Sequence, residues 1–264
     1  MGFVIEEFDE RVYGTKGAWD DFEDSSLKYQ GWLVDTHGTI ELSRQQSVSG
    51  KYSMKVVDAT SSSPAHALRQ IPSMKSGTVG AKLMVPSTND TPFVMELKSA
   101  YNYEHMKFTI AAIYVTPGGS VGYVDANKVQ HELCTVEAGS WNDYAVSFDV
   151  SAGTATLYVN GTSAGNFALP SETPVYDLSG NVVEYADVHG VTVVQFNQAA
   201  TTSPKGDCLY VDDFYANELV DMNRSLEAPA EQTLLGRFVS IVIKVIEVGG
   251  ELVEISQWGW IPGL

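Results

Sequence analysis

The chain has 264 residues, of which 44% are hydrophobic and 19% are charged, a balance typical of a folded globular protein rather than a disordered one. Its 33 acidic and 16 basic side chains give a net charge of -17, which repels phosphate backbones and anionic lipid. Nucleic acid and membrane surfaces are therefore not expected partners. The length suits one large β-sandwich with additions.

Residues 1–18 are expected to form an arm ahead of the domain, because apolar residues there precede two glycines, Gly14 and Gly17. Acidic residues stand where an export signal would carry basic ones, so no signal peptide is expected. No apolar run approaches the ~20 residues of a transmembrane helix. Cys134 and Cys208 match no metal-binding spacing and are expected to be free thiols.

Short β-rich runs separated by turn residues fill residues 19–219, which predicts one sandwich domain with little helix. The clearest unit spans residues 143–149 and 154–160, which alternate in polarity on either side of a short loop. The pair Asn160-Gly161 tolerates positive φ and predicts a tight turn into a third strand. These runs predict a three-stranded meander.

After the domain, residues 220–233 are polar and are expected to be a linker, and residues 234–264 predict a β-hairpin that turns at Gly249-Gly250. The first strand of that hairpin is apolar on both faces, which a two-stranded ribbon in water cannot satisfy. We expect an assembly element that docks on another subunit, although it could instead fold back onto its own domain. The proposed assembly residues are Phe238, Ile241, Val242, Ile243, Val245, Ile246, Trp258 and Trp260.

Four short motifs occur in a recognisable order: DFED at residues 21–24, SVSGKYSMKV at 47–56, GSWNDY at 139–144 and LYVDDF at 209–214. This order resembles that of carbohydrate-binding-module and laminin-G (concanavalin-like) jelly rolls over about residues 19–219. The resemblance implies an all-β fold, a jelly-roll β-sandwich with an N-terminal arm and a C-terminal β-hairpin extension. Fold alone does not define function.

The resemblance also implies a structural calcium site, formed by Glu23, Ser49, Gly50, Asp212 and Asp213. Calcium takes carboxylate and carbonyl oxygens that can lie far apart in sequence, which suits this set. The alternative is that these carboxylates are solvated groups at strand edges.

Carbohydrate binding would use aromatic side chains, whose faces contact sugar rings while their edges stay wet. The candidates are Tyr101, Tyr103, Tyr123, Trp141 and Tyr176. For each of them, packing in or around the core is the alternative, and Trp32 and Trp141 are expected core members.

No catalytic signature is present: there is no paired-carboxylate strand motif, G-x-S-x-G, H-E-x-x-H or nucleotide fingerprint, and the five histidines are scattered. The sequence therefore predicts a non-enzymatic virion structural protein, such as a bacteriophage capsid-decoration, fibre or tail-associated protein. Expected partners are copies of itself, other virion subunits and surface glycans. The alternatives are a carbohydrate-binding module of a cell-surface or secreted system and a sandwich-fold glycan hydrolase or lyase.

Overall fold

The computed structural model describes residues 17–24, 26–28, 31–34, 39–58, 65–99, 109–176, 181–198, 206–218, 246–248 and 251–253. The chain divides into two compact units, Met1–Leu219 and Val220–Leu264. Of the arm predicted over residues 1–18, the structure describes Gly17 and Ala18, which belong to a strand of the sandwich and not to an arm, and the linker predicted at 220–233 lies outside the described residues.

The first unit is built from short antiparallel strands, and no helix occurs among its described residues. The strands are β1 (Gly17–Asp20), β2 (Trp32–Val34), β3 (Thr39–Ser43), β4 (Ser53–Val57), β5 (Ala65–Met74), β6 (Ser76–Met84), β7 (Phe93–Lys98), β8 (Thr109–Val115), β9 (Ser120–Val124), β10 (Gln130–Thr135), β11 (Asn142–Asp149), β12 (Thr154–Val159), β13 (Thr162–Ala168), β14 (Glu172–Tyr176), β15 (Val182–Asp187), β16 (Val191–Gln198) and β17 (Cys208–Glu218).

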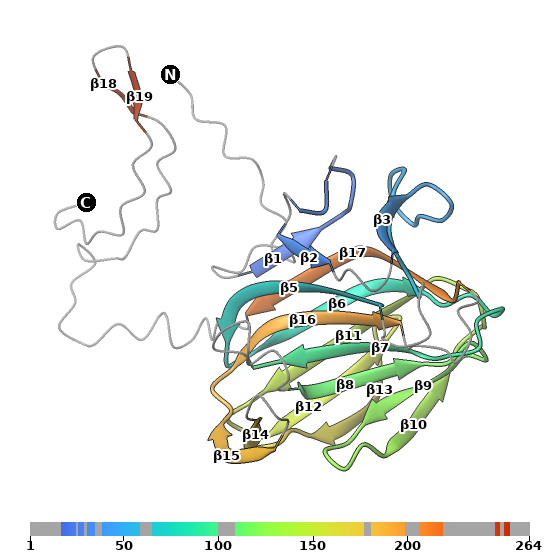
Figure 1. Ribbon diagram of the computed structural model, residues 1–264, viewed down its shortest axis with the longest axis vertical. Coiled ribbons are helices and arrows are strands. Elements are labelled where there is room, and N and C mark those ends of the chain that lie inside the picture. Colours follow the sequence, from blue (N-terminus) through green and yellow to red (C-terminus); the bar gives the residue numbers. More distant parts are fainter. Residues whose placement is uncertain are drawn as a thin grey trace. The chain divides into compact units, whose positions relative to one another are not determined.

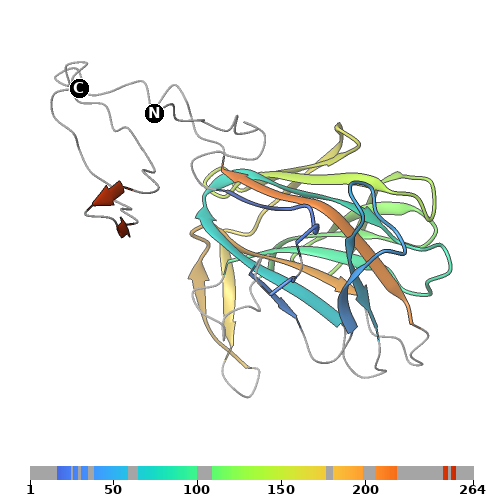
Figure 2. The ribbon, with the colours of Figure 1, turned by 90° about the horizontal axis from the view of Figure 1, so that it is seen from above.

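Two sheets form the layers of a sandwich (Figures 1 and 2). One has the order β13-β12-β11-β6-β17-β4-β3, with β1 also paired to β17, and the other has the order β10-β9-β8-β7-β16-β5-β2. A separate two-stranded sheet joins β14 and β15. The predicted all-β sandwich is confirmed.

The predicted meander is present as β11, β12 and β13, which pair in sequence order. Asn160 and Gly161 have φ values of 51° and 74°, so the turn uses the positive φ that this residue pair was expected to supply. Alternating residues of β11 and β12 enter the core, which is why the period-two pattern was visible in the sequence.

The core is centred on Trp32, which is 1% exposed and lies 5.8, 5.7 and 5.2 Å from the ring centroids of Phe22, Phe196 and Phe214. Phe22 and Phe214 are the phenylalanines of the DFED and LYVDDF motifs, so each motif contributes one ring to the same cluster. Trp32 is confirmed as a core residue. Trp141 is only half-buried, with its ring centroid 6.5 Å from that of Tyr210.

In the second unit, the structure describes two strands, β18 (Ile246–Val248) and β19 (Glu251–Val253). They pair antiparallel, with Val248 opposite Glu251. This pairing agrees with the inner part of the hairpin predicted around Gly249-Gly250. The assembly residues other than Ile246 lie outside the described residues, and the side chain of Ile246 is not described, so the assembly role remains a prediction.

Both cysteines are free, with Cys208 buried and Cys134 half-buried, and burial raises the pKa of each thiol. Within the described part of the chain, no helix has the length and apolar character needed to cross a bilayer.

Candidate functional site

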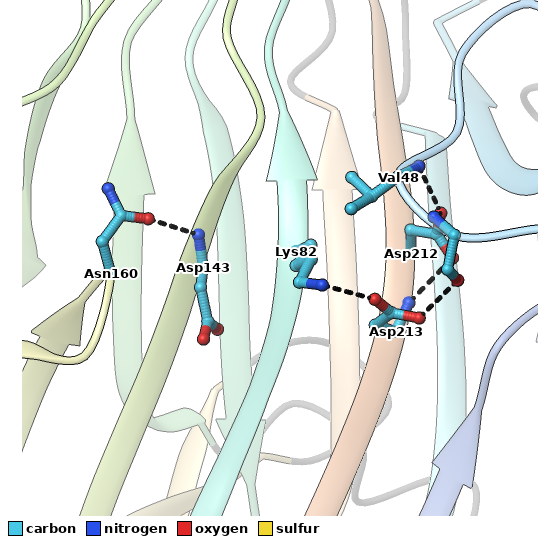
Figure 3. A network of polar contacts seen from close by, with 7 residues as sticks. Val48, Lys82, Asp143, Asn160, Asp212 and Asp213 are labelled. Atoms are coloured by element: carbon cyan, nitrogen blue, oxygen red, sulfur yellow. Dashed lines mark hydrogen bonds and ion pairs between the residues drawn. The ribbon is translucent and has the colours of Figure 1, made fainter.

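The residues predicted to bind calcium come together around the loop at residues 47–52. Asp212, which is fully buried, accepts hydrogen bonds at Oδ2 from the amides of Val48 at 2.7 Å and Ser49 at 3.1 Å (Figure 3). The Ser49 hydroxyl donates to Oδ1 of Asp213 at 2.7 Å. Two adjacent carboxylates of β17 therefore hold the start of this loop.

Glu23 holds the end of the same loop. Its Oε1 accepts the amide hydrogens of Lys51 and Tyr52, each at 2.7 Å. A Cβ added at Gly50 would lie 2.2–2.7 Å from the carboxylate atoms of Glu23, so only glycine lets the loop wrap this closely. We refer to Glu23, residues 47–52, Asp212 and Asp213 as the loop clamp.

The backbone explains how the motif carboxylates reach the loop while their aromatic neighbours enter the core. Phe22 and Asp213 have φ values of 59° and 47°, in a region that non-glycine residues rarely occupy. Each turns the chain locally, beside Glu23 in one motif and between Asp212 and Phe214 in the other. The strain is located where the two motifs meet the loop.

A row of charges crosses the eight-stranded sheet beside the clamp (Figure 3). The Lys82 ammonium donates to Oδ2 of Asp213 at 2.7 Å. Asp143, on β11, lies directly opposite Lys82 of β6, and the backbone amide of Asp143 donates to Oδ1 of Asn160. Burial raises the pKa of Asp143, although Lys82 opposes that change, and burial raises the pKa of Asp212 to about 6.

Calcium would have to compete with these hydrogen-bond donors. It takes roughly six to eight oxygen ligands, whereas the carboxylates of Glu23, Asp212 and Asp213 already accept amide, hydroxyl and ammonium hydrogens. No group of three acidic, histidine or cysteine side chains within the described ranges converges closely enough to hold a metal ion. As placed, the predicted ligands form a hydrogen-bonded clamp, and calcium binding remains a prediction.

That prediction expects calcium to raise the melting temperature of the wild-type protein, because a ligand that binds only the native state stabilises it by mass action. At a hundredfold excess over Kd, the gain is about 2.7 kcal/mol, or roughly 5–10 °C for a domain of this size. Thermal scans with calcium and with chelator measure it. The shift should shrink in Glu23→Gln and persist in the exposed control Glu172→Gln, whereas superimposable wild-type curves would exclude the site.

Of the five aromatic residues predicted to bind sugars, the structure describes the side chains of two, Tyr123 and Trp141. The ring of Tyr123 stacks on His131 and Phe167, with centroid distances of 4.8 and 4.7 Å, so neighbouring rings cover it. Trp141 is half-buried beside Tyr210. Tyr101 and Tyr103 lie outside the described residues, and the side chain of Tyr176 is not described.

A second polar cluster, which the sequence analysis missed, lies on the outer face of the seven-stranded sheet. Met95 and Leu97 of β7 enter the core, so alternation directs Glu96 and Lys98 to the opposite face. Val194 and Phe196 of β16 also enter the core, so Gln195 and Asn197 lie on the outer face of the sheet. The strands β7 and β16 are adjacent, and Glu96 lies opposite Gln195.

These side chains are joined by hydrogen bonds into what we call the Glu96 network: Glu96, Lys98, Thr109, Gln195 and Asn197. Glu96 accepts from the Thr109 hydroxyl at Oε1 (2.9 Å) and from the Asn197 amide at Oε2 (2.7 Å). The Lys98 ammonium lies 3.1 Å from Oε2, and the Gln195 amide donates to Oδ1 of Asn197 at 2.5 Å. Three strands thus hold five polar side chains in fixed positions.

As a group, the side chains of the network are neither fully exposed nor fully buried. Gln195 and Lys98 are buried, whereas Glu96, Thr109 and Asn197 are partly exposed. His66, on β5, lies opposite Asn197 and is also partly exposed. The alternating pairs Glu96/Lys98 and Gln195/Asn197 were the available sequence signal, but nothing in the sequence showed that their strands are neighbours.

No family model matches the chain, and no curated protein matches it. Solved structures do resemble it. A sialidase matches with a TM-score of 0.57 at 15% identity over 80% of this chain, which spans only 19% of the sialidase. A carbohydrate esterase from the Shiga toxin-encoding bacteriophage phi24B matches with a TM-score of 0.54 at 16% identity, covering 78% of this chain and 99% of the esterase.

The cellulose-induced protein Cip1 matches with a TM-score of 0.51 at 18% identity, covering 74% of this chain and 94% of Cip1. At these identities, the likeness concerns the fold. The chain therefore has a sandwich fold shared with carbohydrate-active proteins, in agreement with the jelly-roll resemblance of its motifs.

Proposed function

We propose that this chain is a non-catalytic protein whose jelly-roll domain binds glycans on the outer face of the seven-stranded sheet. The observation that carries the proposal is the Glu96 network. Sugar hydroxyls need donors and acceptors that are already in place, because ordering loose side chains on binding lowers affinity. Here Glu96 and Asn197 are held by hydrogen bonds on neighbouring strands and remain partly exposed. The carbohydrate-active names of the similar structures support the same class of ligand.

The chemistry of this face favours binding over catalysis. Glycosidases use a pair of carboxyl groups on either side of the scissile bond. In the described strands β5, β7, β8 and β16, Glu96 is the one carboxylate, and both of its oxygens accept hydrogen bonds. The Lys98 ammonium also lies 3.1 Å from Oε2 of Glu96. Hydrolase or lyase activity is the alternative, and release of products from a polysaccharide panel would establish it.

Replacing Asn197 by alanine is expected to weaken binding to a polysaccharide bound by the wild type by about tenfold or more, because an amide that positions Glu96 and faces the ligand is lost. Affinity electrophoresis in gels that contain single polysaccharides measures the change. The matched control is Asn166→Ala on β13, in the other sheet, which also removes an amide that hydrogen-bonds a neighbouring strand. Equal retardation of both variants and the wild type would contradict the proposed face.

We further propose that the domain is displayed by a virion, in which it contacts copies of itself and other structural subunits. The match to nearly the whole length of a bacteriophage-encoded protein supports this placement. A carbohydrate-binding module of a cell-surface or secreted system is the alternative. Electron microscopy of the native assembly tests the proposal: regular copies on a particle support it, and a free monomer in infected cells contradicts it.

A further inference from the structure

We propose that the Glu96 network selects uncharged polysaccharides and rejects glycans that carry carboxylate, sulfate or phosphate groups. This inference rests on the proposed glycan-binding function and names the class of ligand. The observation behind it is that the cations of this sheet already have partners within the protein.

An anionic sugar binds best where a cation can approach it, since removing a carboxylate from water without a partner is costly. The described residues of β5, β7, β8 and β16 contain two permanent cations, Lys98 and Arg69. The side chain of Lys98 is 8% exposed and lies 3.1 Å from Oε2 of Glu96. An incoming anion would have to displace Glu96 or lie beside its negative charge.

The side chain of Arg69 lies on the core side of the same sheet. Its Nη1 donates to the carbonyl of Trp19 at 2.9 Å and lies 3.6 Å from Oδ2 of Asp20. The guanidinium also lies over the rings of Trp32 and Phe214, at 5.6 and 5.5 Å from their centroids. Arg69 is therefore held by the aromatic core and by a buried carboxylate, away from a ligand on the outer face.

The remaining groups of the network suit hydroxyls. Thr109, Gln195 and Asn197 are neutral, and together they offer both donors and acceptors, which is what a sugar hydroxyl requires. The Glu96–Lys98 pair adds no net charge to the face. The net charge of -17 also repels polyanions over longer distances, so an experiment must separate this general repulsion from selection by the face.

The test uses pairs of matched polymers: neutral glucans and galactans, and the same polymers with their primary hydroxyls oxidised to carboxylates. Binding of the wild-type chain is measured at about 0.15 M and about 1 M salt, where the Debye length falls from about 8 to about 3 Å. We expect at least tenfold weaker binding to the oxidised polymer at both salt concentrations. Discrimination that disappears at high salt would show that net charge is responsible, and would overturn the inference.

The second arm is Glu96→Gln, which keeps the shape of the side chain but releases the Lys98 ammonium from its partner. We expect the ratio of the Kd for the oxidised polymer to the Kd for the neutral polymer to fall by at least tenfold. Glu172→Gln, which makes the same charge change on the exposed strand β14, should leave the ratio as in the wild type. An unchanged ratio in folded Glu96→Gln overturns the inference.

Outcomes for the two proposals are distinguishable. Tighter wild-type binding to the oxidised polymer refutes selection for neutral glycans but leaves glycan binding intact. Binding to neither member of any pair refutes the proposed function, and the inference fails with it.

Discussion

Gly50→Ala is expected to destabilise the domain by about 2–4 kcal/mol. Gly50 has a φ of 56°, where an L-residue costs about 1–2 kcal/mol. The new Cβ would also meet the Glu23 carboxylate at 2.2 Å. Moving Glu23 breaks its hydrogen bonds to the amides of Lys51 and Tyr52, which contribute roughly 1 kcal/mol each in this exposed setting. Urea denaturation of wild type and variant measures the loss.

Gly161→Ala is the control that separates the backbone cost of a positive φ from the clash with Glu23. Gly161 has a φ of 74°, but nothing lies within 4 Å of an added Cβ, so this control carries the backbone cost alone. It should lose about 1 kcal/mol. In the Glu23→Ala background, Gly50→Ala should cost no more than Gly161→Ala, because the clash has been removed. Equal losses in Gly50→Ala and Gly161→Ala with Glu23 present would show that the hydrogen bonds of Glu23 to the loop contribute nothing to stability.

Asp20→Ala is expected to destabilise the domain by about 3–5 kcal/mol, because its removal leaves buried polar partners without an acceptor. Asp20 is 2% exposed and accepts hydrogen bonds from the indole of Trp32 and the amide of Phe22, both at 2.7 Å. It also lies 3.6 Å from the Arg69 guanidinium. Burial raises the pKa of this carboxyl, and the hydrogen bonds from Trp32 and Phe22 and the charge of Arg69 oppose that rise only in part. Chemical denaturation and near-UV circular dichroism of Trp32 report the effect.

Asp149→Ala is the matched control, since its carboxylate accepts the amide hydrogen of Ala152 at the surface. That variant should lose about 1 kcal/mol or less. Asp20→Asn should fall between the two, because the amide keeps one acceptor but no longer balances the charge of Arg69. If Asp20→Ala lost no more stability than Asp149→Ala, the hydrogen bonds of Asp20 would not stabilise the aromatic core.

The sandwich and its meander could be predicted from local sequence because their signals are local. Alternation along residues 143–149 and 154–160 indicates which side chains face the core, and the pair Asn160-Gly161 indicates the turn. The association of Glu23, residues 49–50 and Asp212-Asp213 was also predicted, through the resemblance of their motifs. The structure adds that amide hydrogens and Lys82 hold these carboxylates, which no motif describes.

The candidate glycan-binding face, in contrast, was decided by tertiary structure. Glu96 and Asn197 are separated by 101 positions in the chain and meet because β16 lies between β7 and β5 in the sheet. Period-two alternation tells which face of a strand a residue occupies, but not which strand becomes its neighbour. Tyr123 shows the same limit: its sequence neighbourhood allowed a sugar-stacking role, but packing of the two sheets placed its ring against Phe167. The sequence by itself therefore determined the class of fold and the faces of its clearest strands, while strand order, a non-local property of the folded chain, assembled the polar network.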